Sequence, residues 1–380
     1  MASLKVAGFK RTLPDDERRQ ILASIDKCLL TGQFAPGEHV EAFESAFAQY
    51  VGRRHAIALS SGGSALEVAM RALDVAGREV LVPTNTFLAT YAAVLAAGGM
   101  PVLIDIDVMT GSPSAAQVDQ AIGPKTCGVV MVHIGGLISP EIEAIAALCA
   151  RRGVWLFEDC AHAHGSSVGG LMAGGFGIGG AYSFCSTKIV TCGEGGMLVT
   201  DDSNLAAKAR LLRNYGKPEP WVTISVEFGM NWRLNELAAI VGASQVRSLD
   251  GIVARRRAIA NRYTELLSRL DGFRHLEPAG ESSWYKYMVL IPSHIDRDDL
   301  RHQLQDAGIG IPGGVYDMPL HKQPALASTA GGHFPGSDAF SATHLCLPIY
   351  PELTDLEINY VADQLKRFWA SDRAYQHSSV

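Results

Sequence analysis

Residues 154–165 read VWLFEDCAHAHG, an apolar run that ends in two acidic residues and is followed by two histidines. The run is continuous rather than alternating, which is typical of a strand buried on both faces of a sheet. Open sheets of such strands bind their ligands beyond the carboxyl ends of the strands. We therefore expect Glu158 and Asp159 to lie at the edge of the sheet that binds a ligand.

Runs of the same kind lie on both sides of this stretch. The strand candidates are HAIALSS 55–61, EVLVP 79–83, PVLIDID 101–107, CGVVMVH 127–133, AYSFCS 181–186 and GMLVT 196–200. Apolar residues at helical spacing separate them, over Ser64–Asp74, Leu88–Ala97, Pro140–Arg151 and Ser203–Asn214. This alternation predicts an α/β fold with a mostly parallel central sheet that helices cover.

The pattern changes after residue 250. A basic helix is expected around Arg255–Leu270, then strand WYKYMVLIP 284–292, helix Asp296–Ala307, strand HLCLPI 344–349 and helix Thr354–Trp369. A chain of 380 residues is long enough for two or three cores. We predict a large α/β domain over 1–250, with residues 1–25 free to pack on the other part, and a small α+β domain over 251–380. The Gly- and Pro-rich stretch Gly310–Gly336 is expected to be a long functional loop.

The composition excludes several classes of partner. Lys and Arg number 33 against 39 Asp and Glu, with no basic block, so nucleic acid is not expected. The most lipid-like stretch, Tyr91–Ile104, is shorter than the ~20 residues that span a bilayer, and the N-terminus lacks the apolar core of a secretory signal. Seven cysteines without a CxxC pair favour reduced thiols. We expect a cytoplasmic protein with no membrane contact.

Two glycine-rich segments could bind phosphate. Gly62-Gly63-Ser64 follows a strand and opens a helix, where free N–H groups and the helix dipole attract anions; an ordinary turn with Ser64 as N-cap is an equal alternative. Gly175–Gly180 matches GxGxxG, the string of NAD-binding sites. It leads into a strand rather than a helix, so a flexible glycine loop is the better interpretation.

Asp159 and Lys188 are the strongest candidates for chemistry. A carboxylate at the end of an apolar strand needs a partner, which could be a cation, a metal held with His162 and His164, or a protonated ring nitrogen; a structural cap of the next turn is the simpler reading. Lys188 lies between two strand-like runs. Desolvation lowers the pKa of such an amine and makes it a nucleophile toward carbonyls, although most single lysines lie at the surface.

Taken together, these segments resemble the DegT/DnrJ/EryC1/StrS family of pyridoxal 5'-phosphate (PLP)-dependent sugar aminotransferases, of the aspartate aminotransferase-like fold type I. The resemblance covers about residues 10–370. It rests on five motifs in order: the Ser-Gly turn, PTNTFLAT 83–90, EDCAHAHG 158–165, SFxxxK 183–188 with GEGGM 193–197, and GMNWRLNELAA 229–239.

The resemblance implies a role for each matched position. Lys188 would form the Schiff base with the cofactor and Asp159 would pair with its pyridine nitrogen, which keeps the ring an electron sink. Phe87 would stack on the ring, and His162 would hydrogen-bond its phenolic oxygen. The phosphate would be bound by Gly62, Gly63, Ser64, Ser183 and, from the neighbouring subunit, Asn231, which implies a homodimer with shared active sites.

Two positions depart from the family pattern. Gly63 replaces the usual Thr of the phosphate turn, which removes a hydroxyl donor, and Ser64 is expected to compensate. Cys185-Ser186 replaces the common pair of larger residues before the lysine, which should change the packing beside Lys188.

The implied function is ping-pong transamination from glutamate or glutamine to a keto sugar. We expect a nucleotide-linked 4-keto-6-deoxyhexose, with a 3-keto isomer or a cyclitol ketone as alternatives. Tyr316 and His321 are candidate substrate contacts, although His321 could simply satisfy loop carbonyls. The rival functions are a non-catalytic PLP-binding sensor and an NAD-dependent sugar oxidoreductase that uses Gly175–Gly180.

Overall fold

The structure is a computed structural model that describes residues 4–219, 221–292, 295–329 and 331–377. Its central sheet has seven strands in the order β1-β9-β8-β5-β4-β2-β3. They are β1 (His55–Leu59), β2 (Glu79–Pro83), β3 (Met100–Ile104), β4 (Thr126–Val132), β5 (Trp155–Asp159), β8 (Gly179–Ser183) and β9 (Gly196–Thr200). Only β9 runs against its neighbours, so the predicted mostly parallel sheet is confirmed.

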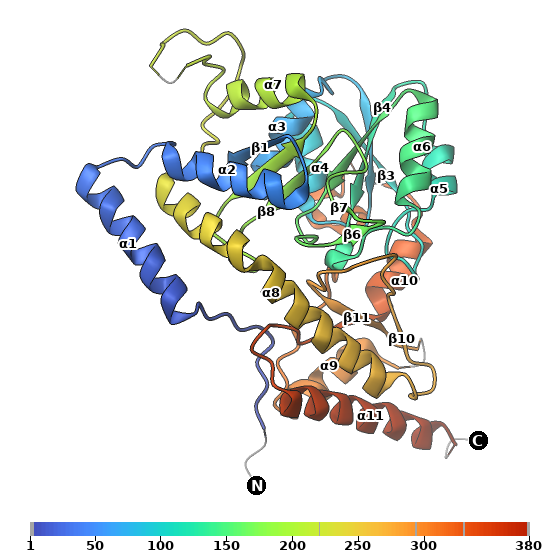
Figure 1. Cartoon of the computed structure of the whole chain (residues 1–380). Helices are drawn as coiled ribbons and strands as arrows, with labels where there is room; N and C mark the ends of the chain where they lie inside the picture. The colour runs from blue at the N-terminus through green and yellow to red at the C-terminus, as the bar shows by residue number, and fades with distance from the viewer. Residues whose placement is uncertain (1–3, 220, 293–294, 330, 378–380) are drawn as a thin grey trace.

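Helices cover both faces of this sheet (Figure 1). Alternate residues of β1 show why: Ala56 and Ala58 pack in one apolar core, whereas Ile57 and Leu59 pack in another. The helices of this part of the chain are α2 (Glu38–Val51), α3 (Gly62–Ala72), α4 (Leu88–Ala96), α5 (Ala115–Ala121), α6 (Ile142–Arg152) and α7 (Ser203–Arg213), with the short strands β6 (Ser167–Val168) and β7 (Leu171–Met172).

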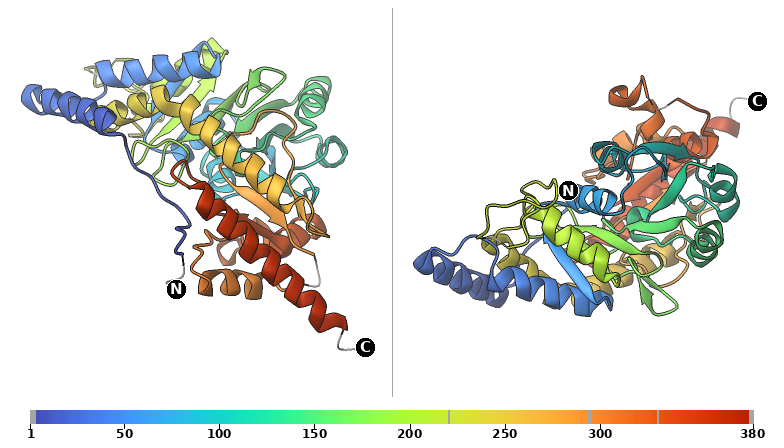
Figure 2. Two further views of the ribbon diagram at one scale, coloured as in Figure 1. Left: turned by 60° about the horizontal axis from the view of Figure 1, so that its bottom comes forward. Right: turned by 90° about the horizontal axis from the view of Figure 1, so that it is seen from above.

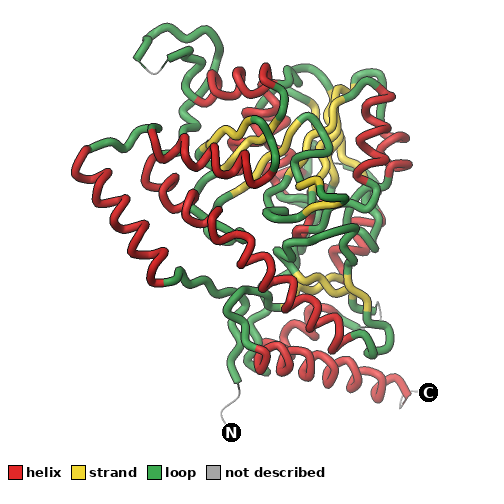
Figure 3. The backbone as a smooth tube through the Cα atoms, in the orientation of Figure 1, coloured by secondary structure: helices red, strands yellow, loops and turns green. Residues whose placement is uncertain are grey.

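A second, smaller sheet lies below the first (Figure 3). It is antiparallel and has the order β10-β11-β12, formed by β10 (Arg274–His275), β11 (Tyr287–Leu290) and β12 (His344–Leu347). The helices α9 (Arg297–Asp306), α10 (Pro335–Thr343) and α11 (Asp355–His377) complete this part, with a core of its own. The α+β pattern expected after residue 250 is therefore present.

Helix α8 (Glu236–Leu267) connects the two parts (Figure 2). It begins 19 residues before the predicted helix start at Arg255, because Asn235 caps it by accepting a hydrogen bond from the Ala238 N–H. Its first half packs in the large core through Leu249 and its second half in the small core through Tyr263. The predicted domain boundary at residue 250 thus falls inside one continuous helix, and the division into two domains stays a prediction.

Helix α8 is also the one described helix that is long and apolar enough, by length and composition, to cross a membrane. Nearly half of its most apolar window is buried inside the structure. A helix shared by two cores passes the same test as a membrane span, so we read α8 as a core helix.

The N-terminal segment contacts both parts. Val6 forms a parallel bridge with Ile309, with the Val6 N–H donating to the Gly308 carbonyl oxygen at 2.9 Å. Helix α1 (Asp15–Thr31) lies along α8, and the buried Glu17 carboxylate accepts hydrogen bonds from the Ser244 hydroxyl and the Gln245 amide. The chain between them crosses the loop that carries Lys188.

Candidate active site

One cavity of about 490 Å³ lies at the carboxyl ends of the central strands. Asp159 ends β5, Ser183 ends β8, and Phe87 follows β2. Parallel strands deliver their last residues to the same edge, so segments far apart in sequence meet here. The lining residues are Ser61, Gly62, Gly63, Leu66, Phe87, Ala89, Asp159, Ala161, His162, Ser183, Cys185, Thr187, Lys188, Glu194, Tyr285, Val315 and Tyr316.

The glycine turn opens helix α3 at the wall of this cavity. Ser61 is the N-cap: its hydroxyl oxygen accepts from the Ser64 N–H at 3.0 Å, and the Ser64 hydroxyl oxygen accepts from the Ser61 N–H at 2.8 Å. A reciprocal capping box of this kind leaves the N–H groups of the first helical residues, Gly62 and Gly63, for a ligand. A Cβ on Gly62 would lie 2.7 Å from the Ser183 Cβ, so only glycine fits there.

Ser64 has a different place from the one expected. It is neither the N-cap nor a lining residue of the cavity, because its side chain turns back to Ser61. Ser61, which the sequence did not single out, is the cavity-facing serine of this turn. We expected the Ser64 hydroxyl to replace the Thr hydroxyl that is missing at Gly63. The position of Ser64 in this geometry does not support that expectation.

Asp159 is buried and held by two hydrogen bonds. Its carboxylate accepts from the Thr90 hydroxyl at 2.8 Å and from the Ala161 N–H at 3.1 Å. Burial raises the pKa of this carboxyl group, and the two hydrogen bonds and the Lys188 charge only partly oppose that effect. Asp159 is thus fixed in orientation yet short of positive charge, which suits a carboxylate that awaits a cationic ring nitrogen.

Lys188 lies opposite, on the loop after β8. Its Nζ atom is 5.1 Å from the centroid of the Tyr285 ring, and burial lowers the pKa of the amine. The Arg11 guanidinium, from the N-terminal segment, donates to the carbonyl oxygens of Ser186, Lys188 and Ile189. This clamp fixes the backbone of the lysine loop from outside the cavity.

His162 is buried and neutral. Its Nδ1 atom accepts from the Gly135 N–H at 3.3 Å, which leaves the proton on Nε2, and burial lowers its pKa well below the ordinary value. The ring stacks on Tyr285 at 4.3 Å between centroids. His162 can therefore donate one hydrogen bond through Nε2.

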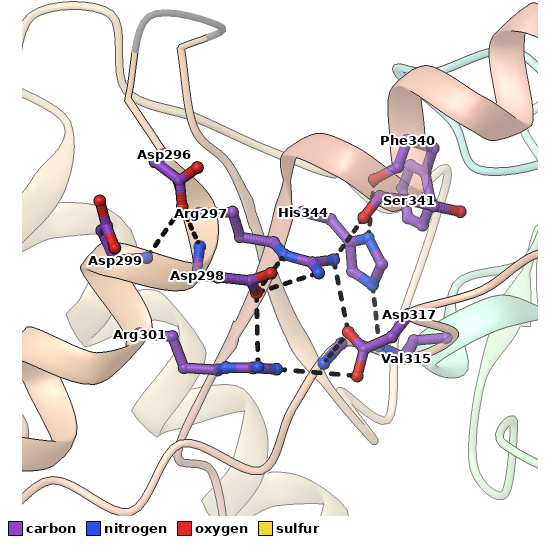
Figure 4. Close-up of polar contacts among 11 residues, drawn as sticks. Asp296, Arg297, Asp298, Asp299, Arg301, Val315, Asp317, Phe340, Ser341 and His344 are labelled. Carbon is purple, nitrogen blue, oxygen red and sulfur yellow. Dashed lines mark hydrogen bonds and ion pairs between the residues drawn. The ribbon is translucent and has the colours of Figure 1, made fainter.

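Tyr316 covers the cavity from the predicted long loop. Its ring lies nearly parallel to that of His162, at 5.9 Å between centroids, and its hydroxyl contacts Thr86 and the backbone of Phe87. Polar contacts anchor the loop on both sides of Tyr316 (Figure 4). The Val315 N–H donates to His344 Nε2 at 2.8 Å, and the Asp317 carboxylate pairs with Arg297 at 3.4 Å.

His321 and Asn231 are not among the lining residues of this cavity. The His321 ring lies 2.8 Å from the Thr84 hydroxyl through Nδ1 and 2.9 Å from the Asp338 carboxylate through Nε2, so both nitrogens have protein partners. Asn231 lies on the exposed segment between α7 and α8, where it bridges Asn214. The substrate role of His321 and the phosphate role of Asn231 stay predictions, and the geometry of this single chain gives neither of them support.

The GxGxxG segment forms a closed cradle rather than a flexible loop. The backbone N–H groups of Gly174, Phe176 and Gly177 donate to the fully buried Glu158 carboxylate. The same carboxylate lies 2.8 Å from His133 Nε2. These amides are occupied and cannot bind a dinucleotide phosphate. The expectation of flexibility is wrong, because a buried carboxylate must be hydrogen-bonded and these glycines supply the donors.

Asp159, His162 and His164 do not converge as metal ligands. The His164 ring lies against Phe47, Tyr182 and Phe184, and burial lowers its pKa to about 3. Within the described residues, the group with suitable ligand spacing is His133, Glu158 and Cys160. Both Glu158 oxygens already accept two hydrogen bonds each, so this group is a hydrogen-bonded carboxylate.

Sequence reasoning missed three residues that shape the site. Thr90 falls within PTNTFLAT and was read only as part of that motif, whereas Tyr285 and Arg11 lie about 100 or more residues from Lys188. No local pattern marks a contact of that range. The apolar context of WYKYMVLIP could have marked Tyr285 as a buried aromatic ring, but not its partner.

One cavity brings together a carboxylate at the end of a parallel strand, a lysine with a lowered pKa and a glycine turn at a helix start. This combination defines a PLP enzyme of fold type I. The sequence matches the DegT/DnrJ/EryC1/StrS aminotransferase family over residues 15–366, and the chain belongs to that family. It is a PLP-dependent transaminase, and its relatives are sugar aminotransferases.

Several relatives are similar over nearly their whole length. UDP-N-acetyl-3-dehydro-alpha-D-glucosamine 3-aminotransferase of Acidithiobacillus ferrooxidans is 34% identical over 92% of this chain and 94% of its own. The dTDP-3-amino-3,4,6-trideoxy-alpha-D-glucose transaminase of Streptomyces venezuelae is 33% identical over 94% and 93%. The erythromycin biosynthesis sensory transduction protein EryC1 of Saccharopolyspora erythraea is 35% identical over 92% and 95%.

Solved structures agree with the fold. The aminotransferase TlmJ of Streptoalloteichus hindustanus superposes with a TM-score of 0.87 at 33% identity, covering 96% of this chain and 99% of its own. NtdA of Bacillus subtilis, with the cofactor PMP bound, has a TM-score of 0.86 at 28% identity, covering 94% and 83%. The predicted fold type I and the predicted cofactor are therefore confirmed.

The residues around the cavity fit PLP. The glycine turn offers N–H donors where a phosphate group can bind, the buried Asp159 lacks a full counter-charge, and Lys188 lines the same cavity. Each of the three meets one chemical feature of the cofactor: phosphate, ring nitrogen and aldehyde.

Proposed function

We propose that this chain transfers an amino group from glutamate or glutamine to a keto group of a sugar carried on a nucleotide. The observation that carries the proposal is that Lys188, Asp159 and the glycine turn line one cavity. The nucleotide is supported by the names of the similar enzymes, which act on UDP- and dTDP-linked sugars.

The side chains would divide the work as follows. When bound, PLP supplies an aldehyde that takes up amines and a ring that stabilises negative charge on the carbon that loses its proton. Asp159 would keep a proton on the ring nitrogen, and His162 Nε2–H would donate to the phenolic oxygen. Gly62, Gly63 and Ser183 would bind the phosphate, and Phe87 would stack on the ring.

Lys188 would move the proton between the substrate carbon and the cofactor. Its lowered pKa supports this role, because it favours the neutral form of the amine, which is the form that accepts a proton. The same amine returns the proton when the keto sugar is the substrate, so a single residue serves both half-reactions.

The carbon that receives the amine distinguishes two candidate substrates. The sequence led us to expect a 4-keto-6-deoxyhexose. Two of the similar enzymes have names that place the amine at carbon 3, which favours the 3-keto isomer as a second candidate. A cyclitol ketone stays the third.

The proposal also includes a homodimer whose subunits share each active site. The segment between α7 and α8 projects from the body of the molecule (Figure 1). Five large apolar side chains within its residues 221–230 are exposed. They are Trp221, Ile224, Val226, Phe228 and Met230. So many exposed apolar side chains on one projecting segment favour contact with another chain, and Asn231 directly follows them.

Mass spectrometry of the two half-reactions tests the function. The protein loaded with PLP is incubated with glutamate, freed of amino acid, and then given dTDP-4-keto-6-deoxyglucose, its 3-keto isomer, or scyllo-inosose. We expect an aminated nucleotide sugar, and its complete loss in Lys188→Ala. A protein that takes up PLP but is not converted by glutamate, glutamine or alanine would instead support the sensor, a function that EryC1 has in its name.

A further inference from the structure

Lys286 lies beside Lys188 and has no acidic partner among the described residues. It directly precedes β11, and its Nζ atom is 5.3 Å from the centroid of the Tyr285 ring, the same ring that Lys188 Nζ approaches to 5.1 Å. Its backbone N–H donates to Gly135, but its ammonium group makes no hydrogen bond or ion pair within the described part of the chain.

The surroundings of Lys286 leave its charge uncompensated. The Arg256 guanidinium adds a second buried cation, and it donates only to the carbonyl oxygens of Trp284 and Tyr285. The Cys346 thiol is neutral, since burial raises its pKa to about 12. A partly buried ammonium without an anion is costly, so this position suits a negatively charged ligand.

Asp317 is the carboxylate that acts on Lys286 across the loop, and it is already engaged. Figure 4 shows it directed toward Arg297 and Arg301, at 3.4 and 3.8 Å. Its oxygen also accepts from the Gly314 N–H at 2.9 Å. Asp317 therefore balances two arginines and does not neutralise Lys286.

A small cavity of about 20 Å³ lies beside Lys286 and shares three lining residues with the main cavity. Its lining includes Lys286, Lys188, Thr187 and Tyr285, and the last three also line the main cavity. A space of this volume holds about one water molecule or one carboxylate oxygen. An anion bound to Lys286 would thus lie next to the amine that moves the proton.

We propose that Lys286 binds a carboxylate of the amino-acid donor. This inference rests on the proposed transamination. A diphosphate of the nucleotide is the other anion that reaches the site, but it is separated from the keto carbon by the sugar ring, whereas the α-carboxylate of every donor is attached to the carbon that reacts. Lysine pairs with a carboxylate through a compact point charge, which the narrow space permits.

The test measures donor binding separately from turnover. The α-methyl analogues of glutamate and alanine have a carboxylate but no α-proton, so the change they cause in the visible spectrum of the PLP-loaded protein reports binding alone. In Lys286→Met we expect their Kd to rise about tenfold to a hundredfold, as for a lost charge-assisted hydrogen bond. Lys286→Arg restores the charge on a bulkier group and should recover only part of the affinity, and Lys366→Met, on the surface of α11, is the control.

The second arm measures the Kd of the keto sugar that the wild type aminates best, with the pyridoxamine-loaded protein. It should change less than twofold in Lys286→Met. A raised Kd for the sugar together with an unchanged Kd for the amino-acid analogues would assign Lys286 to the diphosphate and overturn the proposal. An unchanged Kd for both ligands would overturn it as well. If the Lys286→Met variant does not take up PLP, Lys286→Gln replaces it in both measurements. Failure of the wild type to take up PLP would reject the transaminase itself rather than this inference.

Discussion

At the scale of single residues, the burial that suits Asp159 to its proposed cofactor role lowers the stability of the cofactor-free protein. Burial raises the pKa of its carboxyl group above the ordinary 3.8, so the folded chain binds more protons at this site than the unfolded chain. The stability of the cofactor-free protein should therefore fall as the pH rises from 3.8 through the folded pKa. Functional groups held in this way are a common source of lost stability.

We predict that Asp159→Asn stabilises the cofactor-free protein at pH 7 by about 1–2 kcal/mol, because it removes the buried charge. The Asn carbonyl oxygen can still accept from the Ala161 N–H, and the Asn NH2 group can donate to the Thr90 hydroxyl oxygen in place of the bond that Asp159 accepts. Thermal unfolding of the apo proteins measures this. The same variant should bind PLP more weakly. Asp363→Asn, at the exposed partner of Lys366, is the control. An Asn variant less stable than the wild type at pH 7 would show that the charge is well compensated.

Local chemistry in the sequence singled out Asp159 and Lys188, and the family resemblance added Phe87; all three line the cavity, while their roles toward the cofactor stay predictions. Asp159 ends β5, and Lys188 and Phe87 lie on the loops that follow β8 and β2, so the meeting of strand ends brings them to one cavity. The same reasoning could not predict Tyr285 or Arg11, since their contacts with the Lys188 loop depend on how the smaller sheet and the N-terminal segment pack. It also misplaced Ser64, because a capping box was not considered.

At the scale of elements, the loop that carries Tyr316 depends on the tautomer of one histidine. His344 Nδ1 donates to the Phe340 carbonyl oxygen at 2.7 Å, so Nε2 is the acceptor for the Val315 N–H. Protonation of Nε2 would break that second bond. Burial lowers the pKa of His344 to about 4.

This arrangement predicts a pH dependence. The folded chain binds fewer protons at His344 than the unfolded chain, so the stabilisation is complete above pH 6.5 and is lost as the pH falls to about 4. The loss is on the order of 3 kcal/mol. In urea unfolding between pH 7 and 4, the advantage of the wild type over His344→Asn should shrink with falling pH. His302→Gln, at an exposed site on α9, should follow the wild type, and parallel curves for all three proteins would contradict the assignment.

The contact between Arg11 of the N-terminal segment and the loop that carries Lys188 predicts an effect on PLP binding and on stability. Arg11 donates to three carbonyl oxygens of the Lys188 loop, so its removal should loosen the loop without touching the cavity. We expect Arg11→Met to weaken PLP binding about tenfold and to lower the free energy of unfolding by about 1–3 kcal/mol. Equilibrium dialysis with PLP measures the first effect, with the exposed neighbour variant Lys10→Met as the control. Wild-type affinity in Arg11→Met would show that the loop keeps its shape unaided.

The bounds of the buried strands were predicted closely, whereas the bounds of helix α8, which connects the two parts of the molecule, were predicted less well. EVLVP and GMLVT match β2 and β9 residue for residue, because continuous apolar runs leave no other register. The antiparallel direction of β9 could not be predicted, since direction depends on the length and path of a connection. The first half of α8 was missed because GMNWRLNELAA was interpreted only as a site motif, although Asn235 before Glu236 is an ordinary helix start.

At the scale of the whole molecule, the proposed sharing of each active site between two subunits predicts complementation between two inactive variants. Lys188→Ala and Asn231→Asp should each be inactive alone. If Asn231 acts in the neighbouring site, a mixed dimer contains one site with both native residues. Random mixing would then restore about one quarter of the wild-type activity, since half of the dimers are mixed and each has one intact site.

The recovery is measured after unfolding and refolding equal amounts of the two variants together. Phe228→Asp, which charges the exposed patch, should abolish the recovery and shift the protein to a monomer in sedimentation. No recovery in a protein that is dimeric would place Asn231 in the site of its own chain.

Helix α8 also has a consequence for how the molecule unfolds. Because an unbroken helix contributes side chains to the cores on both sides of residue 250, neither core can melt while the other keeps its share of the helix intact. Calorimetry should record a single heat-absorption peak, and the fragments 1–250 and 251–380, produced separately, should each lack a native near-ultraviolet spectrum. We therefore expect any opening that admits the proposed sugar nucleotide to come from the loops around the cavity rather than from a movement of the two parts against each other.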